Sequence, residues 1–247
     1  MQFTQGLALW RSANIFAVTS EACARPVSVR RSLKKGAGAL AASFMAMAAL
    51  VVAPQALTPT ASAEPSCPDI EVIFARGTDE PVGLGRVGSA FVDSLRGQVG
   101  GRSVGAYAVA YPATFDFLAA AGGANDASGH IQWMVNNCPN TRLVLGGYSQ
   151  GAAIVDVLAA VPFPAIGFNA PLPPNVPAHI AALAVFGNPS TKIGLPLTVS
   201  PVYGARSIDL CNVGDPVCSS GDDIAAHSNY GPAGLTDQAA AFVAGLV

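Results

Sequence analysis

The residues best placed to do chemistry form the run G-Y-S-Q-G at positions 147–151, which fits the pattern G-x-S-x-G around Ser149. An apolar stretch at residues 141–146 precedes this run, and residues 152–158, which hold no helix breaker, follow it. Strand, tight turn and helix in this order form a nucleophile elbow, with the serine exposed at a strained tip. Flanking side chains would clash with strand and helix, so glycine is needed there. The run predicts a serine nucleophile; the alternative is a glycine-rich loop with an incidental serine.

A serine hydroxyl attacks poorly unless a base takes its proton as it reacts. The chain has three histidines, His130, His179 and His227. In sheets that carry such an elbow, the chain order is nucleophile, acid and then a histidine on a late loop. Only His227 leaves room for an acid on a suitable loop after Ser149. We expect His227 to be the base, and the other two histidines to be structural or exposed.

The acid that orients the histidine must be held in place. Asp215 lies between Cys211 and Cys218, and a disulfide between these cysteines would fix its loop at both ends. The rivals are Asp209, inside an expected strand, and the adjacent Asp222 and Asp223, which are typical of a solvated turn. We therefore expect Asp215 to be the acid.

The oxyanion formed on attack needs preorganised donors. Gln150 follows the nucleophile and can offer its backbone N–H, and the loop after the first expected strand should supply the second donor. That loop has Gly77, which permits a tight turn, and Thr78, which offers a backbone N–H and a hydroxyl. Thr78 and Gln150 are the expected oxyanion hole.

Residues 83–88 fit the dinucleotide pattern G-x-G-x-x-G, but the rest of that fingerprint is missing. A loop separates these glycines from the preceding strand, and no acid ends the second strand. We expect them to form the loop and helix start beside Thr78, with no cofactor. The sequence has no C-x-x-C pair and no cluster of histidines near its cysteines, so a metal site is not expected.

Alternating strands and helices are expected to position these residues. The expected strands are residues 70–75, 104–111, 141–146, 180–186 and 207–211, and the expected helices are 86–99, 126–135, 152–158 and 236–246. This alternation predicts an α/β fold with a parallel sheet covered on both faces. Residues 162–177 hold six prolines and are expected to form an irregular surface excursion.

Residues 1–63 are expected to be a targeting segment that is removed, which leaves one domain at 64–247. A basic cluster at 30–35, an apolar run at 36–53 and the small residues 61–63 follow the order of a signal peptide. A retained anchor is the less favoured alternative. The pair Arg30-Arg31 also suggests export by the twin-arginine route. The residues around the pair match the twin-arginine pattern only loosely, so the export route stays open.

The expected mature chain is acidic and has an even number of cysteines. Seven basic and 14 acidic residues remain, a net charge of about −7, which argues against nucleic acid as a partner. An even count of cysteines in an exported chain favours disulfides. The short spacing of Cys211 and Cys218 suggests a local bridge, which leaves Cys67 with Cys138; of the three connectivities we favour this one.

Together these motifs resemble the cutinases, small secreted serine esterases of the α/β-hydrolase type. The resemblance spans about residues 67–247 and is carried by residues 74–78, 147–151, 215–218 and the His227 loop. It is nearest to the cutinase-like proteins of bacterial cell envelopes. It implies a lidless three-layer α/β/α sandwich around a short, mainly five-stranded parallel sheet. It also implies Ser149, Asp215 and His227 as the triad, Thr78 and Gln150 as the oxyanion hole, and the disulfide pairing above.

The chain departs from the fungal pattern at two places. Fungal cutinases carry serine where this chain has Thr78, and their loop before the histidine is strongly apolar, whereas Asp222 and Asp223 lie in this one. The second departure argues against cutin itself as the substrate and leaves lipid-ester hydrolysis intact.

The expected function is a secreted or cell-envelope carboxylic-ester hydrolase for lipid or polyester esters, a monomer in transient contact with a lipid interface. The apolar loops 115–118 and 162–166 are candidates for the acyl side of the site, with plain packing as the alternative. An acyltransferase that uses the same acyl-enzyme is one competing function. The other is a non-catalytic envelope-binding or antigenic protein on a hydrolase fold.

Overall fold

A parallel sheet of five strands in the order β2-β1-β3-β4-β5 forms the centre of the protein. The computed structural model describes residues 66–247, so the expected leader lies outside the described residues. The strands are β1 (Ile70–Ala75), β2 (Val104–Ala108), β3 (Arg142–Tyr148), β4 (Ile180–Phe186) and β5 (Ser207–Leu210). Every residue of β1 and β4 is buried, as expected for strands of a parallel sheet with both faces covered.

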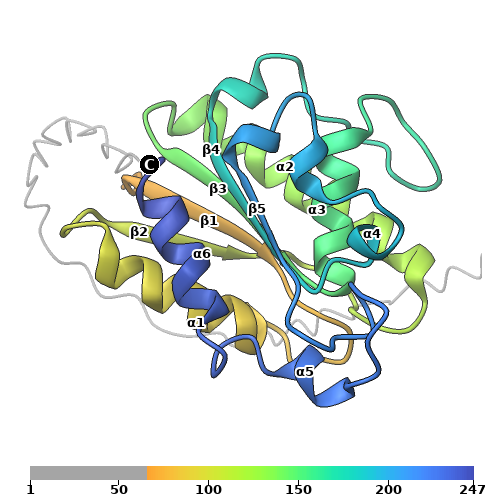
Figure 1. The fold of residues 1–247 in the computed structure, drawn as a ribbon. Helices are drawn as coiled ribbons and strands as arrows, with labels where there is room; N and C mark the ends of the chain where they lie inside the picture. The colour runs from red at the N-terminus through yellow and green to blue at the C-terminus, as the bar shows by residue number, and fades with distance from the viewer. Residues whose placement is uncertain (1–65) are drawn as a thin grey trace, which may run out of the picture. The chain divides into compact units, whose positions relative to one another are not determined.

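Helices cover the two faces of this sheet (Figure 1). On one face, α1 (Gly85–Gln98) and α6 (Leu235–Ala244) enclose an apolar core that includes Phe74 and Phe186. On the other, α2 (Ala120–Asn137) and α3 (Gln150–Ala160) enclose a second core that includes Leu145 and Leu183. The expected three-layer α/β/α architecture is confirmed.

The strand order brings two loops together at one edge of the sheet. The chain passes from β1 outward to β2 and then returns to the other side of β1 to form β3, so the order of the strands reverses between β1 and β3. The last residue of β1, Ala75, pairs with Gly147 near the end of β3. At such a reversal the loops that follow the two strands diverge and leave a crevice. The loop after β1 and the elbow after β3 therefore border the same crevice.

Two expected boundaries are wrong by three residues or more, and two short α-helices were not foreseen. β2 ends at Ala108 rather than at residue 111, and α2 begins at Ala120 rather than at 126. Glycine weakens a helix on its own, but the bare backbone of Gly123 lets α2 approach the rings and methyls of Tyr111 and Ile154. The short helices are α4 (Pro189–Lys192) and α5 (Ile224–Ser228). Within residues 66–247, no helix is both long and apolar enough to cross a bilayer.

Both disulfides join the cysteine pairs that were favoured from the sequence. Cys67 is bonded to Cys138, which links the start of β1 to the end of α2 across 71 positions of the chain. Cys211 is bonded to Cys218, only seven positions away, and closes a small loop after β5. The first bridge therefore restrains the domain as a whole, whereas the second shapes one loop.

Candidate active site

Ser149 occupies the turn between β3 and α3 in a backbone conformation that side chains rarely adopt. Its φ is 55° and its ψ is −118°. The backbone N–H of Ser149 donates to the carbonyl of Phe186 at 2.9 Å, which anchors the turn to β4. Although Ser149 is the N-cap of α3, its hydroxyl makes no capping bond to that helix. A strained turn thus presents a hydroxyl that the helix does not use.

The two glycines of the G-x-S-x-G pattern are required by close backbone contacts. A Cβ on Gly151 would overlap the carbonyl oxygen of Ala75 at the end of β1. A Cβ on Gly147 would overlap the carbonyl oxygen of Gly151 itself. Neither glycine has a positive φ. The crowding expected from the sequence is confirmed, and its cause is the approach of β1, β3 and α3 at the crevice.

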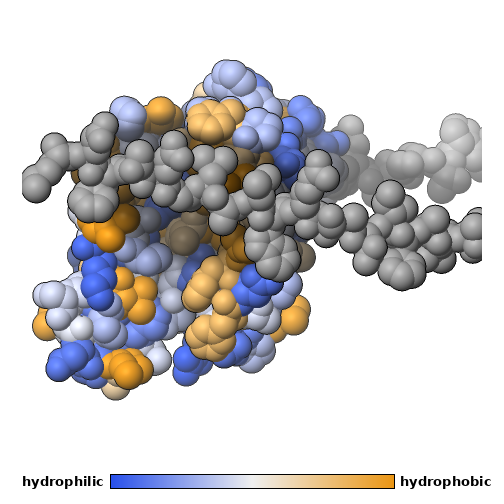
Figure 2. Space-filling view, turned by 90° about the vertical axis from the view of Figure 1, so that its right-hand side faces the viewer, coloured by the Kyte–Doolittle hydropathy of each residue, from blue (hydrophilic) through white to orange (hydrophobic). Residues whose placement is uncertain are grey.

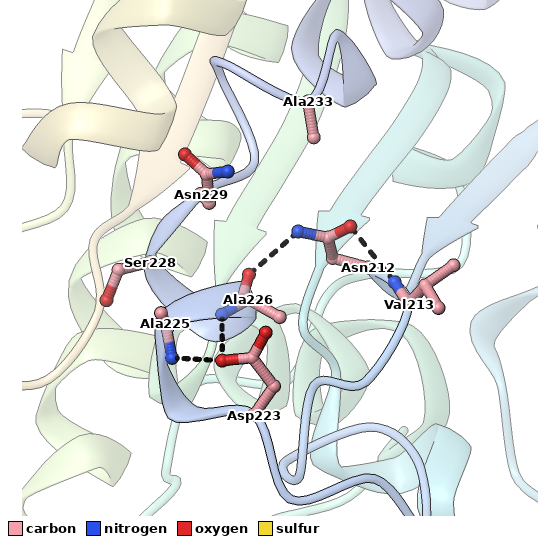
Figure 3. A pocket seen from close by; sticks show the side chains of 8 residues that line it. All are labelled: Asn212, Val213, Asp223, Ala225, Ala226, Ser228, Asn229 and Ala233. Atoms are coloured by element: carbon pink, nitrogen blue, oxygen red, sulfur yellow. Dashed lines mark hydrogen bonds between the residues drawn. The ribbon is translucent and has the colours of Figure 1, made fainter.

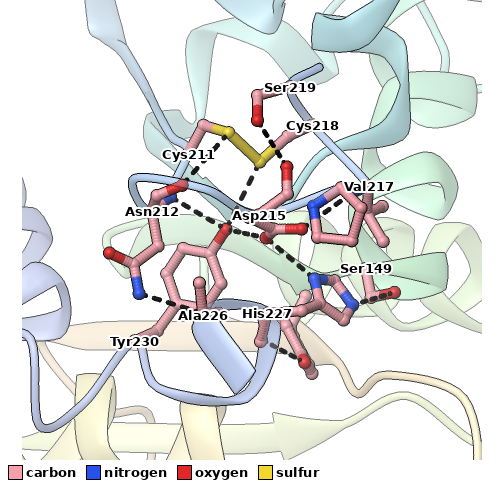
Figure 4. A network of polar contacts seen from close by, with 12 residues as sticks. Ser149, Cys211, Asn212, Asp215, Val217, Cys218, Ser219, Ala226, His227 and Tyr230 are labelled. Carbon is pink, nitrogen blue, oxygen red and sulfur yellow. Dashed lines mark hydrogen bonds and ion pairs between the residues drawn. A yellow bond between two sulfur atoms is a disulfide. The ribbon is translucent and has the colours of Figure 1, made fainter. Parts of the chain in front are cut away.

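Ser149, His227 and Asp215 form one chain of hydrogen bonds (Figure 4). The Ser149 hydroxyl donates to Nε2 of His227 at 3.0 Å. Nδ1 of His227 donates to Oδ2 of Asp215 at 2.8 Å. The Asp215 side chain is fully buried. This is the arrangement in which a histidine takes the serine proton while a buried carboxylate orients the ring.

A fourth residue, Tyr230, completes this network and was not foreseen. Its buried hydroxyl donates to Oδ2 of Asp215 at 2.6 Å, the same oxygen that receives the His227 ring. The hydroxyl also accepts the backbone N–H of Asn212 at 3.2 Å. The other Asp215 oxygen accepts the backbone N–H of Val217 at 2.8 Å. Burial, with the Asp215 contact, raises the pKa of the Tyr230 phenol, so it remains a donor.

The helix that carries His227 is held from two sides (Figure 3). Asp223 is its N-cap and accepts the backbone N–H groups of Ala225 and Ala226 at 2.9 and 3.2 Å. The Asn212 amide donates to the Ala226 carbonyl at 2.9 Å. Asp222 and Asp223 are exposed, as expected of a solvated segment, but the role of Asp223 as a helix cap was not foreseen. An aspartate ahead of a helix-forming run is a recognised start signal, and it was available in the sequence.

Tyr148, the second residue of the G-Y-S-Q-G run, supports His227 from the other side. Its hydroxyl donates to the His227 carbonyl at 2.6 Å, and the two rings lie 5.0 Å apart. Burial raises the pKa of Tyr148 to about 12. Gly77 lies against the Tyr148 ring, where a Cβ would come within 2.6 Å of it. Gly77 does not have a positive φ, so close approach rather than a tight turn requires glycine there.

Thr78 and Gln150 lie together beside Ser149. The Thr78 hydroxyl donates to Oε1 of Gln150 at 3.4 Å, and Nε2 of Gln150 donates to the carbonyl of Thr114 at 2.9 Å. Gln150 is the first residue of α3, so its backbone N–H has no acceptor within the helix. The loop that carries Thr78 is anchored by Glu80, whose carboxylate accepts the backbone N–H groups of Gly77 and Arg86, each at 2.8 Å.

The rival residues have other partners. Nε2 of His130 is 3.0 Å from the Glu71 carboxylate, and its ring stacks on Tyr107. Asp209 accepts hydrogen bonds from the Asn188 amide and the Thr191 hydroxyl, each at 2.9 Å. His179 is partly buried just before β4. Within residues 66–247, no group of three or more His, Cys, Asp or Glu side chains is placed to hold a metal ion.

A parallel sheet with helices on both faces and a nucleophile elbow at its carboxyl edge has the α/β-hydrolase fold. Residues 66–247 match the Cutinase family over their whole length. The chain therefore belongs to the cutinase family, and it is a serine carboxylester hydrolase.

Relatives with curated names agree with this assignment. The chain is 57% identical over 209 residues to the phospholipase Culp4 of Mycobacterium tuberculosis, covering 84% of this chain and 90% of that protein. It is 48% identical over 223 residues to the probable carboxylesterase Culp3 of the same organism, covering 89% and 84% of the two chains.

Solved structures resemble it as well. A Trichoderma reesei cutinase in complex with a phosphonate inhibitor is 34% identical, with a TM-score of 0.59 and coverage of 73% of this chain and 77% of that one. An acetylxylan esterase is 28% identical, with a TM-score of 0.63 and coverage of 73% and 99%.

Proposed function

We propose that Ser149 is the nucleophile of the ester hydrolase, His227 its general base and acid, and Asp215 the residue that orients His227. The continuous hydrogen-bond chain from the Ser149 hydroxyl to the buried Asp215 carboxylate carries this proposal. As Ser149 Oγ bonds to the ester carbonyl carbon, its proton passes to Nε2 of His227. The protonated ring then gives that proton to the departing alcohol, which leaves an acyl-enzyme. Water, deprotonated by the same histidine, releases the acid and restores Ser149.

The backbone N–H groups of Gln150 and Thr78, with the Thr78 hydroxyl, are proposed to stabilise the oxyanion. Support comes from the position of Gln150 at the start of α3 and from the contact between the Gln150 and Thr78 side chains. The Thr78 hydroxyl donates one long hydrogen bond, to Oε1 of Gln150 at 3.4 Å, and it loses this bond when it turns toward the substrate. Donors fixed before the reaction can stabilise developing negative charge without reorganisation.

Lipid esters are the proposed substrates, reached by transient contact with a lipid interface. Large apolar side chains are exposed in the segments that follow β1, β2 and β5 at the carboxyl edge of the sheet, on loops or at the first residue of a short helix: Val82, Phe115, Phe117, Val213 and Ile224. Figure 2 shows apolar and polar patches interspersed on one face of the molecule. An apolar rim around a crevice is suited to an interface. The relative Culp4 of Mycobacterium tuberculosis is named a phospholipase, which agrees with this substrate class.

Export of the protein is also proposed, with residues 1–63 removed and residues 64–247 acting as a monomer outside the cytoplasm. The two disulfides support an oxidising compartment. Sequencing the N-terminus of protein recovered from the culture medium or envelope tests the cleavage. Light scattering on the mature protein tests the monomer.

The nucleophile is tested with the variant Ser149→Ala and its matched control Ser94→Ala, on α1. S149A is expected to lower kcat/KM for nitrophenyl butanoate by at least about a thousandfold. S94A is expected to keep the wild-type value. A fluorophosphonate probe should label Ser149 in the wild type, and no label there would favour a non-catalytic binding protein. Wild-type rates in S149A would overturn the proposal.

A further inference from the structure

Arg76, the residue directly after β1, is a buried cation that bonds to backbone and not to a carboxylate. Only 3% of its surface is exposed, and within residues 66–247 it forms no ion pair. A buried charge needs hydrogen-bond partners. Nε of Arg76 donates to the carbonyl of Glu80 at 2.9 Å, and Nη2 donates to the carbonyls of Tyr111 and Pro112 at 2.8 and 3.3 Å. One guanidinium therefore joins the loop after β1 to the loop after β2.

Tyr111 completes this connection in the opposite direction. Its hydroxyl donates to the backbone carbonyl of Arg76, and the guanidinium carbon of Arg76 lies 5.1 Å from the centre of the Tyr111 ring. Burial raises the pKa of the Tyr111 phenol well above its usual range, so the hydroxyl remains a donor. The same Arg76 carbonyl lies against the elbow, where a Cβ on Gly151 would come within 2.6 Å of it. Arg76 is thus fixed at its side chain and at its backbone.

A second bond between the two loops joins residues in a strained conformation. The backbone N–H of Asp79 donates to the carbonyl of Ala113 at 2.7 Å. Asp79 and Ala113 have φ values of 60° and 52°, in the left-handed region that favours glycine. Such conformations persist only where the surrounding structure holds them. Asp79 directly follows Thr78, and Ala113 directly precedes Thr114, so the strain lies next to the two residues that contact Gln150.

Gln150 closes these contacts into a ring. Its side chain accepts the Thr78 hydroxyl and donates to the Thr114 carbonyl. The Thr78 loop, the Thr114 loop and the first residue of α3 therefore hold one another pairwise, and Arg76 spans the two loops. The spacing between the N–H groups of Thr78 and Gln150 depends on this ring. Donors that are misplaced by about 1 Å can cost about a hundredfold in rate.

We propose that Arg76 is a positioning residue of the ester hydrolase, which sets the spacing of the two oxyanion donors by bonding to both loops. The inference rests on the proposed function, in which Thr78 and Gln150 supply those donors. Arg76 acts through Thr78 and not on the substrate. Arginine is required because its planar fork reaches carbonyls of two loops at once, whereas the ammonium group of lysine is a single point of charge.

The role is tested with the variant Arg76→Lys, which keeps the charge and loses the fork. With nitrophenyl butanoate, kcat is expected to fall about tenfold to a hundredfold while KM changes less than about twofold, because the oxyanion exists only in the transition state. Rates are measured where the variant is folded and are expressed per Ser149 labelled to completion by a fluorophosphonate probe. Tyr111→Phe removes only the hydroxyl bond to Arg76 and should lower kcat about fivefold; it is the test if R76K does not fold.

A second arginine in the fold provides matched controls. The guanidinium carbon of Arg206 lies 5.1 Å from the centre of the Tyr203 ring, and Nη2 of Arg206 donates to the Val202 carbonyl at 3.4 Å. This pair directly precedes β5, at the edge of the sheet opposite the elbow. Arg206→Lys and Tyr203→Phe are therefore expected to keep the wild-type kcat.

A double-mutant cycle with Thr78→Val separates positioning from a general effect on the fold. T78V alone should lower kcat at least about tenfold. In the T78V background, R76K should cost at least about threefold less than in the wild type, because residues that act on one feature are not additive.

Two outcomes would overturn the positioning role. One is a wild-type kcat per labelled Ser149 in R76K and Y111F, which would leave Arg76 a purely structural residue. The other is an equal cost of R76K in both backgrounds while T78V itself is impaired. Failure of the proposed function has a different signature, since S149A would then keep the wild-type rate or T78V the wild-type kcat.

Discussion

At the scale of single residues, Tyr230 extends the site beyond serine, histidine and aspartate. One oxygen of Asp215 accepts both the Tyr230 hydroxyl and the His227 ring, at 2.6 and 2.8 Å. A donor to the ionised form of a carboxylate lowers its basicity. Tyr230 therefore moderates the attraction between Asp215 and a protonated His227 while holding the carboxylate in place. Its role is one of positioning, because it acts through Asp215.

The variant Tyr230→Phe is expected to lower kcat and to leave KM near its wild-type value, because the phenol holds Asp215 and does not touch Ser149. Loss of the bond should lower kcat about tenfold, as expected for a hydrogen bond to a charged group. Tyr107→Phe is the control, since that hydroxyl also contacts a carboxylate, Asp126, elsewhere in the fold. An unchanged kcat in Y230F would show that Tyr230 is only a packing residue.

At the scale of elements, the two disulfides have separable effects. Cys211–Cys218 closes a loop of seven positions that contains Asp215, and Cys67–Cys138 spans 71 positions. Restricting the unfolded chain stabilises more when the closed loop is longer. The long bridge should therefore matter more for unfolding, and the short bridge more for the position of Asp215.

Replacing each pair of cysteines by serine tests this division. Without Cys67–Cys138, the free energy of unfolding should fall by about 2–5 kcal/mol while kcat is retained at a temperature where the protein is folded. Without Cys211–Cys218, kcat should fall more than tenfold with a smaller loss of stability, because Asp215 is no longer held at both ends. Urea denaturation and kcat, measured on both variants, provide the readouts. Equal effects on kcat would refute the assignment.

At the scale of the whole molecule, charge is expected to influence which lipid surfaces the enzyme uses. Residues 64–247 hold seven basic and 14 acidic side chains, a net charge of about −7. Long-range repulsion should keep the protein from anionic surfaces at low ionic strength. Hydrolysis of zwitterionic phospholipid vesicles is therefore expected to exceed that of vesicles with anionic lipid, and the difference should shrink near physiological salt as screening increases. Faster hydrolysis of the anionic vesicles at low salt would contradict this expectation.

The sequence by itself determined the strands, the elbow and the short Cys211–Cys218 bridge, because each is encoded over a short stretch. The Cys67–Cys138 pairing followed only as the pair that was left. Five apolar runs separated by helical stretches predicted the α/β fold, and the glycines around Ser149 indicated the crowded turn. The order of Ser149, Asp215 and His227 along the chain singled out the three side chains that the structure brings into one hydrogen-bonded chain.

Only the tertiary structure decided what depends on segments meeting in space. The hydrogen bond from Tyr230 to Asp215 exists because α5 folds back over the loop after β5, a contact that no spacing predicts. The start of α2 was missed because packing against Tyr111 compensates for its glycines. An apolar groove between α3, the start of α2 and residues 165–168 needs three separate segments, and nothing local marks Ile166 as the residue at a left-handed hairpin tip. Local patterns specify elements and the residues they present, whereas long-range packing decides which of those residues share a site.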